Sequence, residues 1–176
     1  MLFDFAATLI HGQRIRGATE AIETRNWAHL AQLVEEGLDP NQKLSTKSLT
    51  EMARQGAKYT TPLLAMSMYQ IGGDGRQGQI QPDAYCLLLA KGGDPFLAVG
   101  NDKRNAFDHL VNIRNLRGIQ LIANAGIDVR KANLEANKLS WEEGAAWASE
   151  YRAQKDALDL AQETPETPVA RARHRF

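Results

Sequence analysis

Apolar residues recur every three or four positions in several short stretches, the spacing that buries one face of a helix. Two such stretches follow one another before Gly37, and two more before Gly126. Their apolar positions are Ala18, Ala21 and Ile22 then Trp27, Leu30, Leu33 and Val34 in the first set, and Phe107, Leu110 and Val111 then Leu116, Ile119, Ile122 and Ala123 in the second. Each stretch is too short to form a stable helix alone in water. We therefore predict pairs of short helices that bury their apolar faces jointly with neighbouring pairs.

One local pattern occurs three times along the chain. A leucine-rich or isoleucine-containing stretch is followed by glycine, one further residue and aspartate, at Gly37, Gly92 and Gly126. A glycine just past a helix adopts the left-handed conformation without the penalty that a Cβ atom causes. An aspartate two residues later turns the chain by hydrogen bonding to nearby backbone. The pattern predicts three helix pairs that end in equivalent corners, and hence a repeat architecture.

These features together resemble the ankyrin-repeat family. The segment from Ala18 to Asn41 aligns without a gap to the helix–turn–helix–Gly-x-Asp stretch of that family, and so does the segment from Phe107 to Arg130. Thr61-Pro-Leu-Leu-Ala65 is similar to the family's Thr-Pro-Leu-His helix opener, whose threonine caps the helix and whose proline occupies its first turn. Asn105-Ala-Phe-Asp108 stands at that place in the third repeat. The resemblance covers roughly residues 17–160.

The resemblance implies an all-α fold, an ankyrin-like solenoid of stacked helix-turn-helix repeats with capping helices. A solenoid of stacked helices of another kind is the competing prediction. We expect a single domain over residues 1–162 and an extended basic tail over 163–176. Within the domain, we predict an N-terminal capping helix over 2–11 and repeats at about 17–41, 59–96, 103–130 and 138–162. The last repeat is predicted either as one long helix or as a fourth hairpin.

Two insertions lengthen the interval between the first and second corners. In the first insertion, Ser48-Leu-Thr-Glu51 has the spacing of a capping box and Gly56 supplies a stop, which predicts a small helix at about 49–55. The second insertion, Gly72–Gly78, holds four glycines in seven residues and predicts a mobile loop. It lacks the Gly-Lys-Ser/Thr ending and the preceding strand of a phosphate loop. A further capping-box spacing, Ser140–Glu143, predicts the start of the last helix.

Composition and charge narrow the function classes. Lys plus Arg and Asp plus Glu both number 21, which argues against a nucleic-acid-binding protein because such proteins carry an excess of basic residues. The single cysteine, Cys86, excludes an internal disulfide and a cysteine-based zinc site. No apolar run approaches the roughly 20 residues of a membrane span, and the start of the chain lacks the basic region of a secretory signal. We therefore expect a cytoplasmic protein that does not bind membranes.

Neither a catalytic constellation nor a metal or cofactor site is evident in the sequence. The histidines lie in separate predicted units without metal-ligand spacing: His11, His29, His109 and His174. Cys86 precedes three leucines in a helix that we expect to be buried, where a thiol acts as a small hydrophobic group. The arginines within residues 171–175 are the one basic cluster of note, and a solvated terminus explains them better than a nucleic-acid or acidic-protein contact does.

The resemblance implies a non-enzymatic protein-protein interaction module whose concave face binds a partner protein. Carried over residue by residue, the family's contact positions are Glu23, Lys58, Thr60, Met68, Tyr69, Asn101, Asp102, Arg104, Asn112 and Ile113. Met68 and Tyr69 are the most suggestive pair, because exposed methionine and tyrosine are enriched at interfaces; packing against the glycine-rich insertion is the other interpretation. We predict that the insertions at 42–58 and 70–81 shape a partner-specific rim.

Small bacterial proteins of this type resemble inhibitors, immunity proteins that block a toxin, and adaptors, so the expected partner is a protein such as a toxin or an effector. Two other classes stay open. One is a secreted effector that engages a host protein, and the other is a small enzyme with a site near Gly72–Gly78. A neighbouring toxin gene would favour the first class, export the second, and activity at the loop the third.

Overall fold

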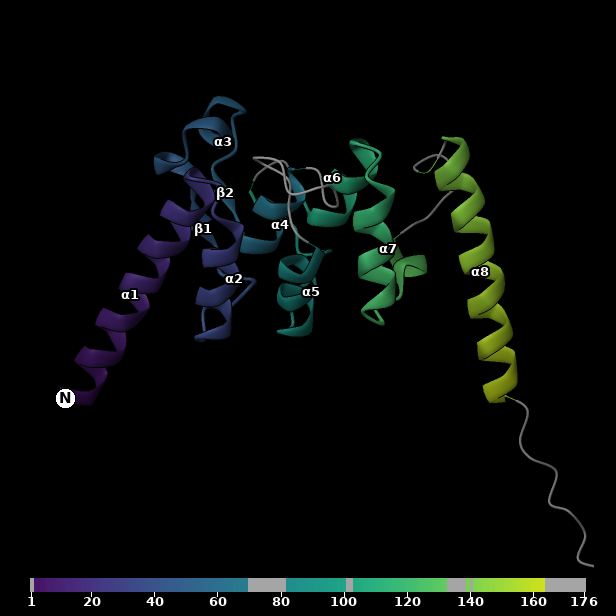
Figure 1. Ribbon diagram of the computed structural model, residues 1–176, viewed down its shortest axis with the longest axis horizontal. Helices are drawn as coiled ribbons and strands as arrows, with labels where there is room; N and C mark the ends of the chain where they lie inside the picture. Colours follow the sequence, from purple (N-terminus) through teal and green to yellow (C-terminus); the bar gives the residue numbers. More distant parts are fainter. Residues whose placement is uncertain (1, 70–81, 101–102, 133–138, 140, 164–176) are drawn as a thin grey trace, which may run out of the picture.

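The computed structural model describes residues 2–69, 82–100, 103–132, 139 and 141–163, and this part of the chain is mostly helical (Figure 1). Its α-helices are α1 (Leu2–Glu23), α2 (Trp27–Glu35), α3 (Thr50–Arg54), α4 (Pro62–Ser67), α5 (Pro82–Ala90), α6 (Ala106–Asn112), α7 (Leu116–Asn124) and α8 (Glu142–Glu163). Two-residue strands β1 (Leu44–Ser45) and β2 (Tyr59–Thr60) pair antiparallel, with Leu44 opposite Thr60. Short 3-10 turns span Thr46–Ser48 and Val129–Ala132. The predicted glycine-rich loop at 72–78, the predicted cap at Ser140 and the tail beyond 163 lie outside the described residues.

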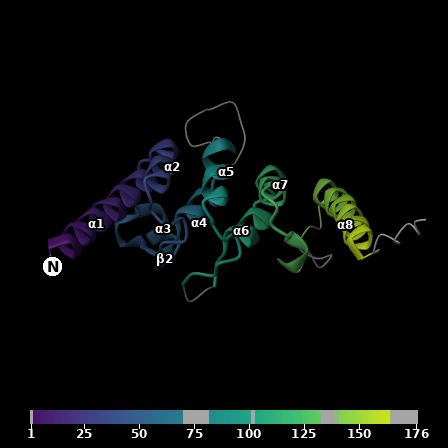
Figure 2. The same ribbon diagram turned by 90° about the horizontal axis from the view of Figure 1, so that it is seen from below.

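The helices form pairs that lie side by side in two layers. α1 packs on α2, α4 on α5, and α6 on α7. Between pairs, α2 packs on α5 and α5 on α7 in one layer, while α1 packs on α4 and α4 on α6 in the other. Figure 2 shows the successive pairs stepping along the long axis of the molecule, with α8 following α7 at the far end. The spacing of apolar residues therefore predicts the helix pairs and their joint burial correctly.

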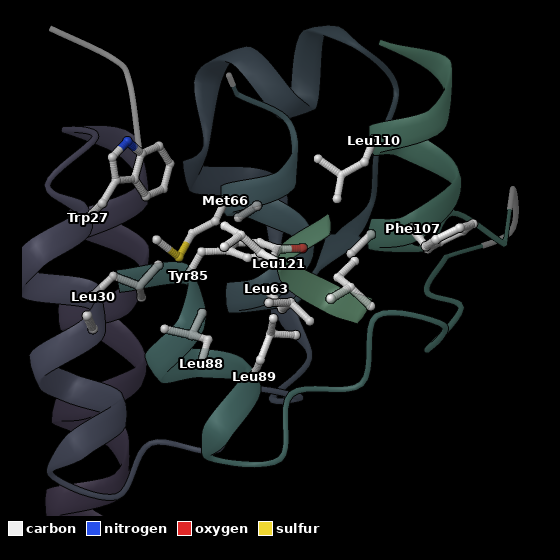
Figure 3. Packing of buried hydrophobic residues seen from close by; sticks show 14 of the residues in the cluster. Trp27, Leu30, Leu63, Met66, Tyr85, Leu88, Leu89, Phe107, Leu110 and Leu121 are labelled. Atoms are coloured by element: carbon white, nitrogen blue, oxygen red, sulfur yellow. The ribbon is translucent and has the colours of Figure 1, made fainter. Parts of the chain in front are cut away.

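A continuous core fills the space between the two layers. Leu30 of α2, Leu63 of α4, and Leu88 of α5 are completely buried. Figure 3 shows them gathered between Trp27 at one side and Phe107 at the other. At roughly 25 cal/mol for each Å² of apolar surface removed from water, such burial is the main stabilising contribution in this fold. Each helix pair thus covers the apolar face of its neighbour.

The three corners predicted from the glycine pattern are confirmed. All three glycines have positive φ: 103° at Gly37, 88° at Gly92 and 82° at Gly126. Each following aspartate accepts a hydrogen bond from the backbone amide two residues on: Asp39 from Asn41 (2.8 Å), Asp94 from Phe96 (2.8 Å) and Asp128 from Arg130 (3.0 Å). The side chain of Asn41 also joins the first corner to the second. Its Nδ2 donates to the Gly92 carbonyl and its Oδ1 accepts from the Asp94 amide, both at 2.8 Å.

The turns inside the first and last helix pairs are also equivalent. Arg25 and Arg114 both adopt the left-handed conformation, with φ of 56° and 55°. The asparagine that follows each arginine caps the second helix of its pair. Asn26 Oδ1 accepts from the His29 amide and Asn115 Oδ1 from the Gly118 amide. These matched turns lie within the two segments that align with each other in sequence.

The two helix openers behave as predicted. Thr61 Oγ1 accepts a hydrogen bond of 3.1 Å from the Leu64 amide, and Pro62 occupies the first position of α4. Asn105 Oδ1 accepts a hydrogen bond of 2.7 Å from the Asp108 amide at the start of α6. Asparagine and threonine therefore play the same role in the second and third helix pairs.

The structure corrects one predicted helix end and one predicted capping box. The N-terminal helix does not end at residue 11 but continues to Glu23, because helix-compatible residues and the buried Ala18 and Ile22 extend it through Gly12. The small helix in the first insertion is present as α3, and Gly56 ends it with φ of 74°. Its predicted capping box is wrong, since Ser48 ends a 3-10 turn and α3 receives no cap from its own flanking side chain. The last helical segment is the single long helix α8.

Candidate partner-binding surface

The first insertion, between β1 and β2, places α3 beside the end of α1 and forms a cleft of about 140 Å³ there. The cleft is lined by Ile22, Glu23, Arg25, Leu49, Thr50, Glu51, Met52, Arg54 and Tyr69. Sites for whole small molecules usually measure about 300–1,000 Å³. This cleft is therefore of a size that suits one side chain.

Glu23 lines this cleft and joins α1 to the insertion. Its carboxylate accepts hydrogen bonds from the Thr50 backbone amide (2.9 Å) and from the Thr50 hydroxyl. Leu49 and Met52, which flank this contact in the insertion, are almost fully buried. A predicted contact residue thus holds the chain's own insertion in place.

Tyr69 lines the cleft and is half-buried. Its ring centroid is 5.0 Å from that of Trp27, and the Arg25 guanidinium carbon lies 4.9 Å from the Tyr69 ring centroid. The tilted aromatic pair and the cation–π contact together restrict the orientation of the ring. Met68, the C-cap of α4, packs partly buried against the core. The observed packing partners of Tyr69 are therefore Trp27 and Arg25.

Arg104 links the loop before α6 to the insertion. It forms an isolated antiparallel bridge with Val99, and its Nη2 donates to the Gln55 carbonyl at 3.4 Å. His109, one turn into α6, has a lowered pKa, first because it is partly buried and second because Arg104 is close. The insertion and this loop are consequently held together at one side of the helix layers.

The remaining predicted contact residues differ in exposure. Lys58 and Asn112 are exposed, and Ile113 is half-buried at the end of α6. Thr60 is 1% exposed and its hydroxyl donates to the Thr61 carbonyl, so the prediction of Thr60 as a contact residue is wrong. The cause is its position in β2, where its side chain faces the core side of the strand pair. Asn101 and Asp102 lie outside the described residues.

The sequence-based selection missed Arg25 and Arg54, which line the cleft with Glu23 and Tyr69. Arg25 reaches Tyr69 from a left-handed turn, and the sequence pattern gives no indication of that geometry. A signal for its position was nevertheless present. Arg25 precedes Asn26 as Arg114 precedes Asn115 in the aligned segments, which marks both as turn residues.

Burial raises the pKa of two further side chains, Tyr85 and Cys86. The Tyr85 hydroxyl pairs with Ser67 Oγ at 2.9 Å, and burial raises the Tyr85 pKa far above its ordinary value. The pKa of Cys86 is raised, chiefly by burial and then by Asp83, which disfavours a reactive thiolate. In the described part of the chain, no group of three or more His, Cys, Asp or Glu residues is arranged to hold a metal ion. The helices described there include none with the length and apolar character needed to cross a membrane.

Comparison with models of known protein families, with curated proteins and with solved structures finds no match to this chain.

Proposed function

We propose that the protein is a non-enzymatic module that binds a partner protein through an ankyrin-like stack of helix pairs. The observation that carries this proposal is the equivalence of the corners at Gly37, Gly92 and Gly126, with the side-by-side packing of the pairs. Stacked units of this kind present an extended surface to which each unit contributes a few side chains. The proposal places the partner on the side that carries α3 and the loop before α6.

The geometry of this side supports binding rather than catalysis. Tyr69 contacts both Trp27 and Arg25, and Glu23 holds α3 through Thr50. A surface whose side chains are fixed before association loses less conformational entropy when a partner docks. An aromatic ring beside an arginine is also the composition found at the energetic centre of many protein interfaces.

Within this proposal, the protein works in the cytoplasm as an inhibitor, an immunity protein or an adaptor. All three roles need a stable surface and no reacting group. A secreted effector would use the same surface, and its export would distinguish it. An enzyme with its site near Gly72–Gly78 would instead require a reactive constellation that includes that loop.

The experiment is an affinity capture from cells that express the protein naturally, followed by measurement of the affinity for the captured protein. We compare the wild type with the double variant Tyr69→Ala/Asn112→Arg and with Glu35→Arg, whose exposed side chain lies on the α2 layer. The wild type and Glu35→Arg should bind the same partner, and the double variant should bind it about tenfold more weakly or not at all. Circular dichroism establishes that the double variant is folded.

Equal binding by all three proteins would place the interface elsewhere. Failure to capture any protein, together with turnover of a small molecule by the purified chain, would contradict the proposed function.

A further inference from the structure

The insertion and the loop before α6 carry an excess of positive charge. We call this region the finger surface and define it by Lys43, Lys47, Arg54, Lys58, Lys103 and Arg104. Figure 2 shows α3, β2 and the loop between α5 and α6 projecting from the same side of the helix layers. The hydrogen bond from Arg104 to the Gln55 carbonyl joins the two parts. The two segments that carry these basic residues therefore lie on the same side of the helix layers, although they are distant in sequence.

Three of these side chains have no ion pair within the described residues. Lys47, Arg54 and Lys58 are exposed and make no ion pair in the described part of the chain. Lys43 instead places its Nζ 4.0 Å from the centroid of the Tyr59 ring. Glu51 is the one acidic residue within positions 43–58, whereas α8 holds more acidic than basic side chains. Basic side chains thus cluster on one surface of a chain whose formal net charge is zero.

We infer that the finger surface docks an acidic polypeptide segment of the partner, an inference that rests on the proposed function and specifies the chemistry of the partner. Exposed positive side chains such as Lys47, Arg54 and Lys58 attract a negatively charged segment and orient it before contact. The cleft between Glu23 and Arg54 adjoins the finger surface and receives one side chain of that segment.

The observations favour a polypeptide over a nucleic acid. Glu51 lies on α3 among the basic residues, and the Glu23 carboxylate forms part of the neighbouring cleft. An unbroken row of phosphates would meet both carboxylates, whereas a polypeptide can place acidic and neutral side chains alternately. A phosphate backbone also binds best to a surface without carboxylates in its path.

The test is a selection of peptides from a random 12-residue display library against the full chain, followed by fluorescence anisotropy with the best labelled peptide. The variant Lys47→Glu/Lys58→Glu reverses two exposed charges that make no internal ion pair among the described residues. The matched control Lys91→Glu/Arg117→Glu makes the same change at exposed positions after α5 and on α7. Selected peptides should be rich in Asp and Glu. They should bind the finger variant about tenfold more weakly and the control within about twofold of the wild type, with affinity falling as salt rises.

The other outcomes overturn the inference in distinguishable ways. If the selected peptides are neutral or basic, or if acidic peptides bind the finger variant as well as the wild type, the inference fails and the proposed binding module stands. If no peptide is selected but a labelled single-stranded oligonucleotide binds the wild type and not the finger variant, both the inference and the proposed protein-binding function fail. If the chain associates with itself through this surface, as sedimentation of the wild type and finger variant would reveal, the occupant is a second copy and the inference of a separate partner fails.

Discussion

The carboxylate of Glu23, the last residue of α1, caps α3 by accepting hydrogen bonds from the backbone amide and the hydroxyl of Thr50. The two residues are 27 positions apart in sequence. Leu49, the N-cap of α3, supplies no side-chain acceptor. A five-residue helix cannot persist by itself in water, so α3 depends on α1 for its start and on the buried Leu49 and Met52 for its packing.

The first prediction concerns this cap. Replacing Glu23 by alanine should leave the helix pairs folded but increase local opening of α3, because loss of an N-cap costs about 1 kcal/mol. Hydrogen exchange of the Ala53 and Gln55 amides, which donate within α3, should quicken by about fivefold. Glu20→Ala, one turn earlier on α1, is the matched control and should leave these amides unchanged. Equal protection of α3 in both variants would contradict the capping role.

Local patterns predicted the helix pairs because their causes are local. A glycine after a helix, as at Gly92, and a capping side chain, as at Asn105, act within a few residues of their own position. The spacing of apolar residues likewise identified Leu30, Phe107 and Ile119 as core residues, and all three are fully buried. The helix pairs, their caps and these core residues can therefore be predicted from the sequence.

The predictions that were wrong concern features that depend on contacts between residues distant in sequence. Ser48 has the correct spacing to cap α3, but Glu23 supplies the cap from another helix. The resemblance implies that Thr60 contacts a partner, whereas its side chain in β2, which pairs with β1, is buried. The cleft that Tyr69 lines arises from the position of the insertion relative to α1. No pattern along the chain encodes those distances.

The second prediction compares two glycines. At Gly92, with φ of 88°, an added Cβ would meet nothing within 4 Å, so Gly92→Ala tests backbone strain without a steric clash. Alanine there should lower the free energy of unfolding by roughly 1 kcal/mol. Gly12 lies inside α1 and is equally free of neighbours, so Gly12→Ala should raise that free energy by roughly 0.5–1 kcal/mol. Urea denaturation measures both. Changes of the same sign would contradict a left-handed requirement at Gly92.

The third prediction concerns the attachment of α8. The Arg130 guanidinium contacts Asp128 (2.9 Å), Asp156 (3.0 Å) and Asp159 (2.9 Å), and these carboxylates raise its pKa further above the ordinary value. Arg130→Ala should therefore loosen α8, while the core contacts of Ala148 and Tyr151 preserve part of its docking.

Limited proteolysis measures this loosening. Cleavage within residues 152–160 should be faster in Arg130→Ala than in the wild type, and the difference should shrink at high salt because screening weakens exposed ion pairs. Arg117→Ala, an exposed arginine on α7, is the control and should be cleaved at the wild-type rate. A salt-independent difference would point to lost packing rather than to the ion pairs.

The fourth prediction follows from Tyr85, which is fully buried and has a strongly raised pKa because burial disfavours the phenolate. The unfolded chain ionises this tyrosine near its ordinary pKa of about 10, whereas the folded chain keeps it neutral. The unfolded state therefore binds fewer protons above that pH, and stability should fall as pH rises, by up to about 1.4 kcal/mol per pH unit from this group.

Tyr85→Phe should be less stable at neutral pH, by about 1 kcal/mol for the lost Ser67 hydrogen bond. Its stability should nevertheless fall less steeply with pH in the alkaline range. Urea denaturation between pH 8 and about pH 11 measures both effects, with Tyr59→Phe, an exposed tyrosine, as the control. An unchanged slope in Tyr85→Phe would mean that another group drives alkaline unfolding.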